Sequence, residues 1–105
     1  MTNRPTLDEL RRMPRLYATE RLPAPEKVIH MHFLFGESDW YAVEFDGEDL
    51  FFGFAVLNGD MLNMELGYFS LAELDKIELW GFEVLRDPDW TPVAAGEVEA
   101  LRGWI

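Results

Sequence analysis

The stretch EFDGEDLFFGFAVLNGD, residues 44–60, decides how the middle of this chain folds. Its centre, LFFGFAVL at 50–57, carries no charge and stands between two turn signals, DG at 46–47 and NGD at 58–60. Asp-Gly and Asn-Gly favour tight hairpin turns because these residues adopt positive φ at low cost. A continuous apolar run is typical of a strand that packs on both faces. We therefore predict a central strand over 50–57.

The segments around this strand alternate with the period of two that β-strands require. In 28–35, one face is expected to hold Ile29, Met31, Phe33 and Phe35, opposite His30, His32 and Leu34. In 40–45, one face is expected to hold Tyr41, Val43 and Phe45, opposite Trp40, Ala42 and Glu44. The segment 61–70 alternates again. Four antiparallel strands in meander order are therefore expected between residues 28 and 69.

Short helices are expected around the sheet. The Ser/Thr-x-x-Glu spacing of a capping box occurs at 6–9 and again at 70–73, so helices should begin just after Thr6 and Ser70. Pro14 should end the first helix, and 15–27 should form an extended connector. The segment KIELWGFEVLRD, 76–87, predicts a further strand or a bent pair of strands with Gly81 at a bulge.

These elements predict an α+β fold built on a single curved antiparallel sheet of four to six strands with short N-terminal, middle and C-terminal helices. We expect one domain over 1–105, because a chain of 105 residues can enclose one core. Its parts are a helix plus connector over 1–27, a sheet over 28–94 with the short helix after Ser70, and an amphipathic C-terminal helix over 95–105.

The charge of the chain is negative and unevenly distributed. The net charge is -11, and residues 28–75 hold ten Asp and Glu but no Lys or Arg. Such a surface opposes direct binding to nucleic acid or anionic membranes. The chain shows no secretory leader and no run of about 18 apolar residues, so we expect a cytoplasmic protein. The absence of cysteine excludes disulfides, thiolate metal sites and a cysteine nucleophile.

Few residues suggest catalysis. His30 and His32 could supply two ligands to a divalent metal, with Glu44, Glu65 or a loop carboxylate as a third. Glu44 and Glu65 could also act as an acid and base pair. Acidic turn residues could bind calcium, but their spacing does not match an EF-hand loop. We expect no catalytic residue, metal site or cofactor, and keep a small metal-dependent or carboxylate enzyme using His30, His32 and Glu44 as an alternative.

Aromatic side chains are more numerous than a core of this size can enclose. Some of them are therefore expected at the surface, where rings flanked by acid are typical of interfaces. The candidates are Trp40, Tyr41, Phe51, Tyr68, Trp80, Trp90 and Trp104.

Several motifs resemble a known bacterial family. SDWY, DGEDLFFG, LNGD and GYFSLAEL follow one another in residues 38–74, preceded by PRLYATE and followed by RDPDWTPV. From about residue 16 to 97 the chain resembles the family of domain of unknown function 2958 (DUF2958). The resemblance implies no activity and no catalytic residue. It implies a setting on plasmids, conjugative elements and phage-related islands.

This setting and the charge together suggest a non-enzymatic interaction protein of a mobile genetic element. It would inhibit or modulate a nucleic-acid-binding complex, of the anti-CRISPR or anti-restriction type, by placing carboxylates where phosphates sit. The expected partner is a protein with a basic surface, and a second copy of the chain is left open. The expected contact residues are Glu37, Asp39, Asp46, Glu48, Asp49 and Asp60, with Trp40 and Tyr41 as anchors. An accessory domain without a ligand is the other alternative.

Overall fold

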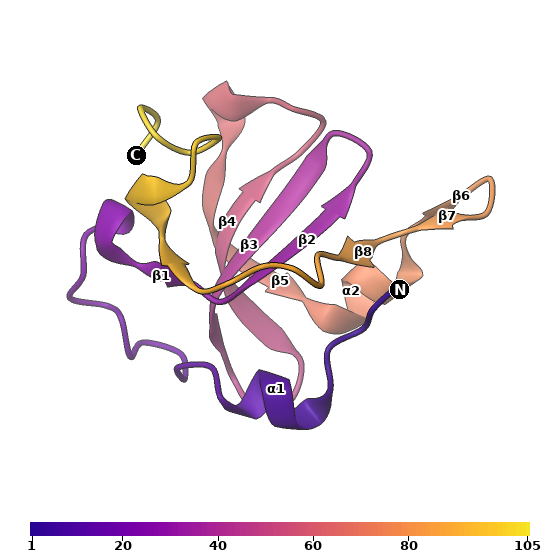
Figure 1. Ribbon diagram of the computed structural model, residues 1–105, viewed down its shortest axis with the longest axis horizontal. Helices are drawn as coiled ribbons and strands as arrows, with labels where there is room; N and C mark the ends of the chain where they lie inside the picture. Colours follow the sequence, from indigo (N-terminus) through magenta and orange to yellow (C-terminus); the bar gives the residue numbers. More distant parts are fainter.

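The protein is organised around a five-stranded antiparallel sheet (Figure 1). The computed structural model describes all of residues 1–105. The sheet has the order β5-β4-β3-β2-β8 and consists of β2 (Met31–Phe35), β3 (Ser38–Phe45), β4 (Leu50–Val56), β5 (Glu65–Ser70) and β8 (Leu85–Arg86). The strands β2, β3, β4 and β5 lie side by side in the sheet in the same order as in the chain, which confirms the predicted meander. The α+β class is also confirmed.

Smaller elements surround the sheet. Two further pairs of strands are β1 (Val28–Ile29) with β9 (Val93–Ala94) and β6 (Glu78–Leu79) with β7 (Phe82–Glu83). The helices are α1 (Leu7–Arg11), α2 (Leu71–Lys76) and the short 3-10 helices η1 (Ala24–Glu26), η2 (Met61–Asn63) and η3 (Ala95–Glu97). Neither α1 nor α2 has the length and apolar run needed to cross a bilayer.

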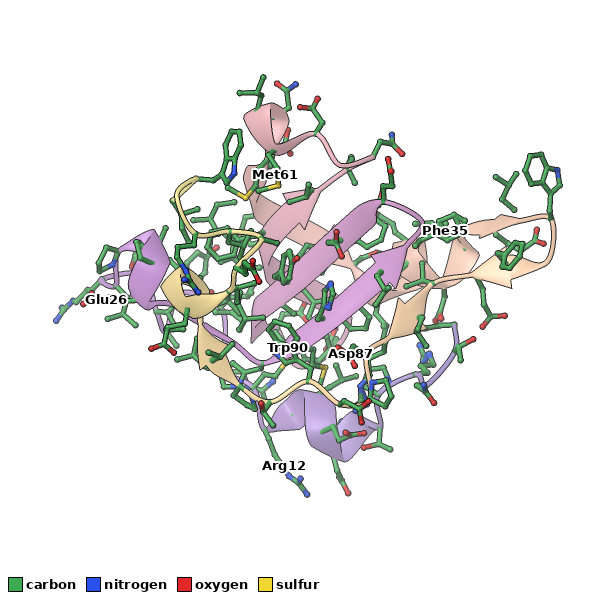
Figure 2. All side chains as sticks on the ribbon, turned by 45° about the horizontal axis from the view of Figure 1, so that its top comes forward. Arg12, Glu26, Phe35, Met61, Asp87 and Trp90 are labelled. Atoms are coloured by element: carbon green, nitrogen blue, oxygen red, sulfur yellow. The ribbon has the colours of Figure 1, made fainter.

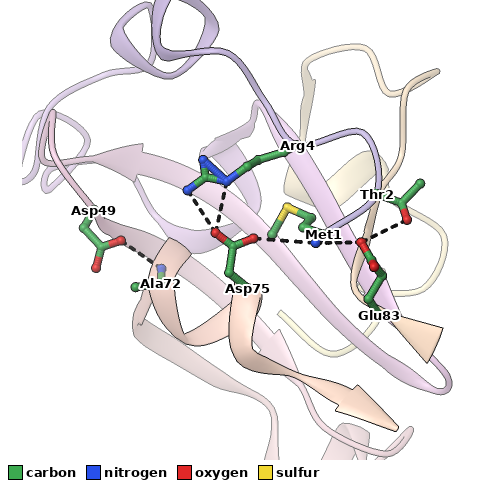
Figure 3. Close-up of polar contacts among 7 residues, drawn as sticks. All are labelled: Met1, Thr2, Arg4, Asp49, Ala72, Asp75 and Glu83. Carbon is green, nitrogen blue, oxygen red and sulfur yellow. Dashed lines mark hydrogen bonds and ion pairs between the residues drawn. The ribbon is translucent and has the colours of Figure 1, made fainter. Parts of the chain in front are cut away.

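The two α-helices begin where the sequence predicts. Thr6 Oγ1 accepts from the Glu9 N–H at 3.1 Å, and the Glu9 carboxylate accepts from the Thr6 N–H at 3.0 Å, so this capping box is complete. At α2 only half of the expected box forms, with Ser70 Oγ accepting from the Glu73 N–H at 2.9 Å. Asp49 Oδ1 binds the Ala72 N–H at 2.8 Å as a second cap (Figure 3).

The predicted C-terminal helix is wrong. Residues 95–97 form η3, which packs beside η1, and turns make up most of the remaining residues (Figure 1). The Ala95 N–H donates to the Lys27 carbonyl at 2.8 Å, which ties the start of the tail to the connector. Gly103 has φ +90°, a conformation outside any right-handed helix. An eleven-residue tail with two glycines is too short to hold a helix against these tertiary contacts.

The sheet is covered on both faces. On the helix face, α1 and α2 enclose a cluster that includes Leu10, Met31, Phe33, Trp40, Phe45, Phe51, Phe69 and Leu74. On the tail face, the C-terminal segment encloses Ile29, Tyr41, Val43, Phe54, Val56, Ala95 and Leu101. Trp90 extends over the tail face (Figure 2), where its Nε1 donates to the Ile29 carbonyl at 3.0 Å. Packing on both sides confirms the prediction for the strand at 50–57.

A β-bulge in β3 overturns the predicted alternation of 40–45. Ala42 pairs with Gly53 and Glu44 pairs with Phe52, so Val43 is an extra residue on its strand. Beyond the bulge the faces exchange: Phe45 joins the helix face and Glu44 turns to the tail face. The alternation predicted for 28–35 also breaks, because His30 interrupts the strand between β1 and β2. As a result Ile29 packs on the tail face, whereas Met31 packs on the helix face.

Candidate functional site

The acidic turns are divided between the two ends of the sheet. In a meander, the turn between β2 and β3 and the loop between β4 and β5 lie at one end, and the turn between β3 and β4 lies at the other. Glu37 and Asp60 therefore lie at one end, whereas Asp46, Glu48 and Asp49 lie at the opposite end. The eight residues of β3 separate the ends by about 24 Å. The predicted contact carboxylates therefore do not form one patch at a single end of the sheet.

Most of these carboxylates also bind groups within the protein. Asp46 Oδ1 accepts from the N–H groups of Glu48, Asp49 and Leu50 at 2.8, 2.8 and 3.0 Å. Burial raises the pKa of Asp46, but these hydrogen bonds and the Arg15 guanidinium outweigh it, so the pKa lies below its ordinary value. Asp49 caps α2, Asp60 accepts from the Asn63 amide, and Asp39 binds His32. Only Glu37 and Glu48 among the six make no side-chain hydrogen bond.

Acid should destabilise the protein partly through Asp46. Because its folded pKa is lowered, the carboxylate stabilises the folded state above the unfolded pKa of 3.8, and this contribution is lost as the pH falls through the folded pKa. Asp46→Asn keeps an acceptor oxygen and does not titrate. In urea unfolding at about pH 7 and about pH 3, the variant should lose less stability than the wild type. Equal losses would contradict the prediction.

The two expected aromatic anchors are buried. Trp40 is 7% exposed on the helix face, and Tyr41 is 4% exposed on the tail face, where it stacks on His32 at 4.6 Å between ring centroids. Burial, with a smaller effect of Asp39, raises the pKa of Tyr41 to about 12. Neither ring can contact a partner without opening the core, because the two residues point to opposite faces of β3 and each face is covered by one of the two clusters.

The residues of the alternative enzyme are not brought together. His32 binds Asp39 at 2.7 Å, while His30 lies between β1 and β2, where burial lowers its pKa. Glu44 lies on the tail face and Glu65 on the helix face, so the two carboxylates cannot share a substrate. The structure contains no group of three or more His, Asp or Glu side chains placed to hold a metal ion.

Glu44 and Lys27 form a buried polar site that the sequence did not predict. Glu44 is 3% exposed and accepts from the N–H groups of Tyr17 and Thr19 at 2.8 and 3.0 Å and from the Thr19 hydroxyl. Lys27 is also buried and donates to the Thr19 carbonyl at 2.6 Å. This network holds the connector, including Tyr17 at φ +72°, against the tail face. The sequence signal for this site was a single Glu among the apolar residues of a predicted strand. Because the bulge could not be predicted, the face of the sheet to which the Glu44 side chain points could not be predicted either.

A cavity of about 410 Å³ opens beside this network. We call it the connector cavity. The residues that line it include Tyr17, Glu20, Lys27, Glu44, Phe52 and Tyr68. Hydrogen bonding with Tyr17 raises the pKa of Tyr68, and burial and the Glu44 and Glu20 carboxylates add to the effect. The cavity therefore combines aromatic walls with a negative electrostatic field.

The β6–β7 hairpin presents the most exposed aromatic rings of the protein. It projects from the body beyond β8 (Figure 1), with Trp80 and Gly81 as its turn. Both turn residues have positive φ, +51° and +84°, as a type I′ turn requires, so Gly81 lies in a turn and not at the expected bulge. Trp80 is 87% exposed and Phe82 is 72% exposed. The prediction that some aromatic residues lie at the surface is thus confirmed.

The base of the hairpin is fixed by the N-terminus (Figure 3). The Met1 amine lies 2.6 Å from the Glu83 carboxylate and 3.7 Å from Asp75 of α2, and Arg4 lies 2.9 Å from the same aspartate. A hydrogen bond from the N-terminal amine lowers the pKa of Glu83. Two charged groups from a distant part of the chain therefore hold the hairpin at a fixed angle to α2.

An apolar groove runs under the hairpin. It has a volume of about 470 Å³ and is lined mainly by Leu34, Phe35, Leu79, Trp80, Phe82 and Leu85. Phe35 lies at the end of β2, near the point where the hairpin leaves the body (Figure 2). The groove residue Gly36 is followed directly by Glu37, so one predicted contact residue borders this surface. A hairpin with two exposed rings and an open apolar groove is suited to binding another protein.

Comparisons with known proteins identify a family but no function. A search of curated proteins and a search of solved structures each found no match. A family model matches residues 4–95, which is most of the chain and includes the whole sheet. The match covers the strands, the hairpin and the connector described above. The chain belongs to the family described as "Protein of unknown function (DUF2958)".

Proposed function

We propose that this is a non-enzymatic interaction protein that binds a protein partner through its β6–β7 hairpin. The observation that carries the proposal is the exposure of Trp80 and Phe82 on a projecting hairpin whose base is held by ion pairs. These rings contribute nothing to the enclosed core, and a fixed exposed Trp is a typical anchor of an interface. The groove bordered by Phe35 and Leu85 offers the adjoining apolar contact.

The charge of the protein favours a partner with a basic surface. The net charge of -11 steers such a partner over long range. Around the hairpin itself the charges are equal in number: the three acids are Asp75, Glu78 and Glu83, and the three cations are the N-terminal amine, Arg4 and Lys76. Added salt should therefore slow association and have little effect on dissociation.

A narrower proposal concerns the kind of partner. A host or defence complex that binds nucleic acid has the basic surface that this charge would seek, and the mobile-element setting implied by the sequence resemblance is compatible with it. The division of the acidic turns between two ends favours binding led by the hairpin over imitation of a phosphate backbone by the turns. Inhibition would then come from occupying or distorting the complex.

Loss of Trp80 should abolish partner capture. Trp80→Ala should weaken binding at least about 30-fold, because an anchoring Trp contributes about 2 kcal/mol or more. The measurement is pull-down from a bacterial lysate at low and high salt, followed by binding kinetics with the captured protein. Leu62→Ala is the matched control, since Leu62 is 84% exposed on η2 and lies outside the groove.

Three results would overturn the proposal. Proteins retained equally by the wild type and by Trp80→Ala would exclude the hairpin as the binding site. Equal loss in Leu62→Ala would show a nonspecific apolar effect. A dimer in sedimentation analysis that Trp80→Ala dissociates would identify the occupant of the groove as a second copy of the chain. Thermal unfolding should be the same in all variants, because neither side chain is enclosed.

A further inference from the structure

Strand β5 forms an open edge of the main sheet. It is the last strand in the order β5-β4-β3-β2-β8, and its exposed residues include Leu66 and Tyr68. The bond from the Leu71 N–H to the Asp49 carbonyl, 2.9 Å, sets the phase of hydrogen bonding along this pair of strands. In an antiparallel ladder the bonded pairs alternate, so the N–H and C=O groups of Leu66 and Tyr68 point away from β4. These groups are free to pair with an incoming strand.

The open edge lies beside the connector cavity. Leu66 and Tyr68 place their side chains on the tail face, where both line this cavity with Tyr17 and Phe52. Three aromatic rings and two carboxylates, Glu20 and Glu44, thus stand next to unpaired backbone groups. Rings of this kind attract cations, and nearby carboxylates strengthen the attraction.

The one basic residue of the cavity, Lys27, offsets only one of these two negative charges. Lys27 donates to the carbonyl and hydroxyl oxygens of Thr19 at 2.6 and 3.3 Å, so its ammonium group is directed into the Glu44 network. The two carboxylates exceed it by one charge. The rise in the pKa of Tyr68, caused first by hydrogen bonding with Tyr17 and also by Glu44 and Glu20, is consistent with a negative field at the edge.

We infer that β5 accepts an extended segment of a protein partner as a sixth strand, and that a Lys or Arg side chain of this segment enters the connector cavity. Backbone hydrogen bonds to Leu66 and Tyr68 would supply the pairing. Alternate side chains of an added strand lie on one face, so one of them can reach the cavity beside Tyr68. Charge complementarity selects a basic segment as the occupant.

A second copy of β5 fits this edge poorly. Residues 65–70 contain Glu65 and no basic residue, so pairing between two copies would bring no cation to either cavity. Each copy would also carry a net charge of -11. The site is separate from the hairpin, because β5 and β8 are the opposite outer strands of the sheet. The inference therefore does not depend on the proposed function of the hairpin.

The test uses a display library of random seven-residue peptides selected on the full chain. Enriched peptides should alternate β-branched residues and share one Lys or Arg. Leu66→Pro removes the outward N–H of an edge strand, whereas Leu66→Ala keeps it, and only the proline variant should lose the backbone pairing. We expect Leu66→Pro to bind at least about tenfold more weakly than Leu66→Ala, the loss of one or more net hydrogen bonds.

Two further variants keep the test decisive if the proline variant does not fold. Glu20→Lys changes an exposed residue of the cavity, and Tyr68→Ala removes a ring; each should weaken binding of the basic peptides at least about tenfold. Trp80→Ala should bind the peptides as the wild type does. Enriched peptides without a basic residue, binding that Glu20→Lys leaves unchanged, or failure to enrich any peptide would overturn the inference.

Discussion

Replacing Glu44 with alanine should lower the free energy of unfolding by about 3–5 kcal/mol, the range for breaking a buried charged network. The substitution leaves the N–H groups of Tyr17 and Thr19 without their acceptor, and both are held at 2.8 to 3.0 Å in the wild type. It also removes the carboxylate that binds the same Thr19 as buried Lys27. Orphaned donors and an uncompensated ammonium group each cost free energy.

The measurement is urea unfolding together with limited proteolysis of the connector. The melting temperature should fall by more than about 10 °C for a domain of this size. Glu44→Gln keeps an acceptor oxygen and should cost less than the alanine variant. Glu48→Ala is the matched control, because this carboxylate is exposed in the same β3–β4 hairpin and makes no hydrogen bond. A loss below about 1 kcal/mol for Glu44→Ala would show that the network is not stabilising.

Gly53→Ala should destabilise the protein by about 3 kcal/mol or more, which is a large effect for a single methyl group. A Cβ at Gly53 would lie 1.9 Å from the Tyr41 carbonyl oxygen and 3.1 Å from Ala42 Cα. These are backbone atoms next to the bulge, so no side-chain rotation can relieve the clash. The strands β3 and β4 would have to separate where Gly53 pairs with Ala42.

Gly67 supplies the control within the same sheet. It pairs directly with Gly53, yet a Cβ there would meet nothing within 4 Å, and its φ is not positive. Gly67→Ala should be neutral or stabilise the protein by up to about 1 kcal/mol, through reduced entropy of the unfolded chain. The two variants are compared by denaturant unfolding. Similar stabilities would mean that the close approach of β3 and β4 at the bulge is not what requires glycine.

The local sequence signals that proved reliable depend on neighbouring residues only. Asp46 and Gly47 form the turn between β3 and β4, and Thr6 with Glu9 forms a complete capping box. The apolar run at 50–57 became the strand with packing on both faces. Each outcome follows from backbone propensity or from a side chain that binds an N–H two to four residues away.

The orientation and exposure of the candidate site residues could not be predicted from local sequence patterns. The bulge at Val43 is invisible in the pattern of 40–45, and it decides that Glu44 faces the connector. Trp40 and Tyr41 satisfy every sequence criterion for interface anchors, yet packing from both faces buries them. Trp80 satisfies the same criteria and is exposed, because a two-residue turn carries it beyond the reach of either cluster.

The sequence alone determined the meander, its turns, the starts of α1 and α2, and the net charge, because each of these follows from composition or from contacts between residues close in the chain. Only the tertiary structure decided which side chains reach a partner. Strand pairing places the acidic turns at opposite ends of the main sheet, and the bulge reverses which face of the sheet Glu44 and Phe45 point to. The N-terminal amine holds the base of the β6–β7 hairpin in place. These outcomes depend on contacts between residues far apart in the chain, such as Met1 with Glu83 and Gly53 with Tyr41, whose geometry no local pattern encodes.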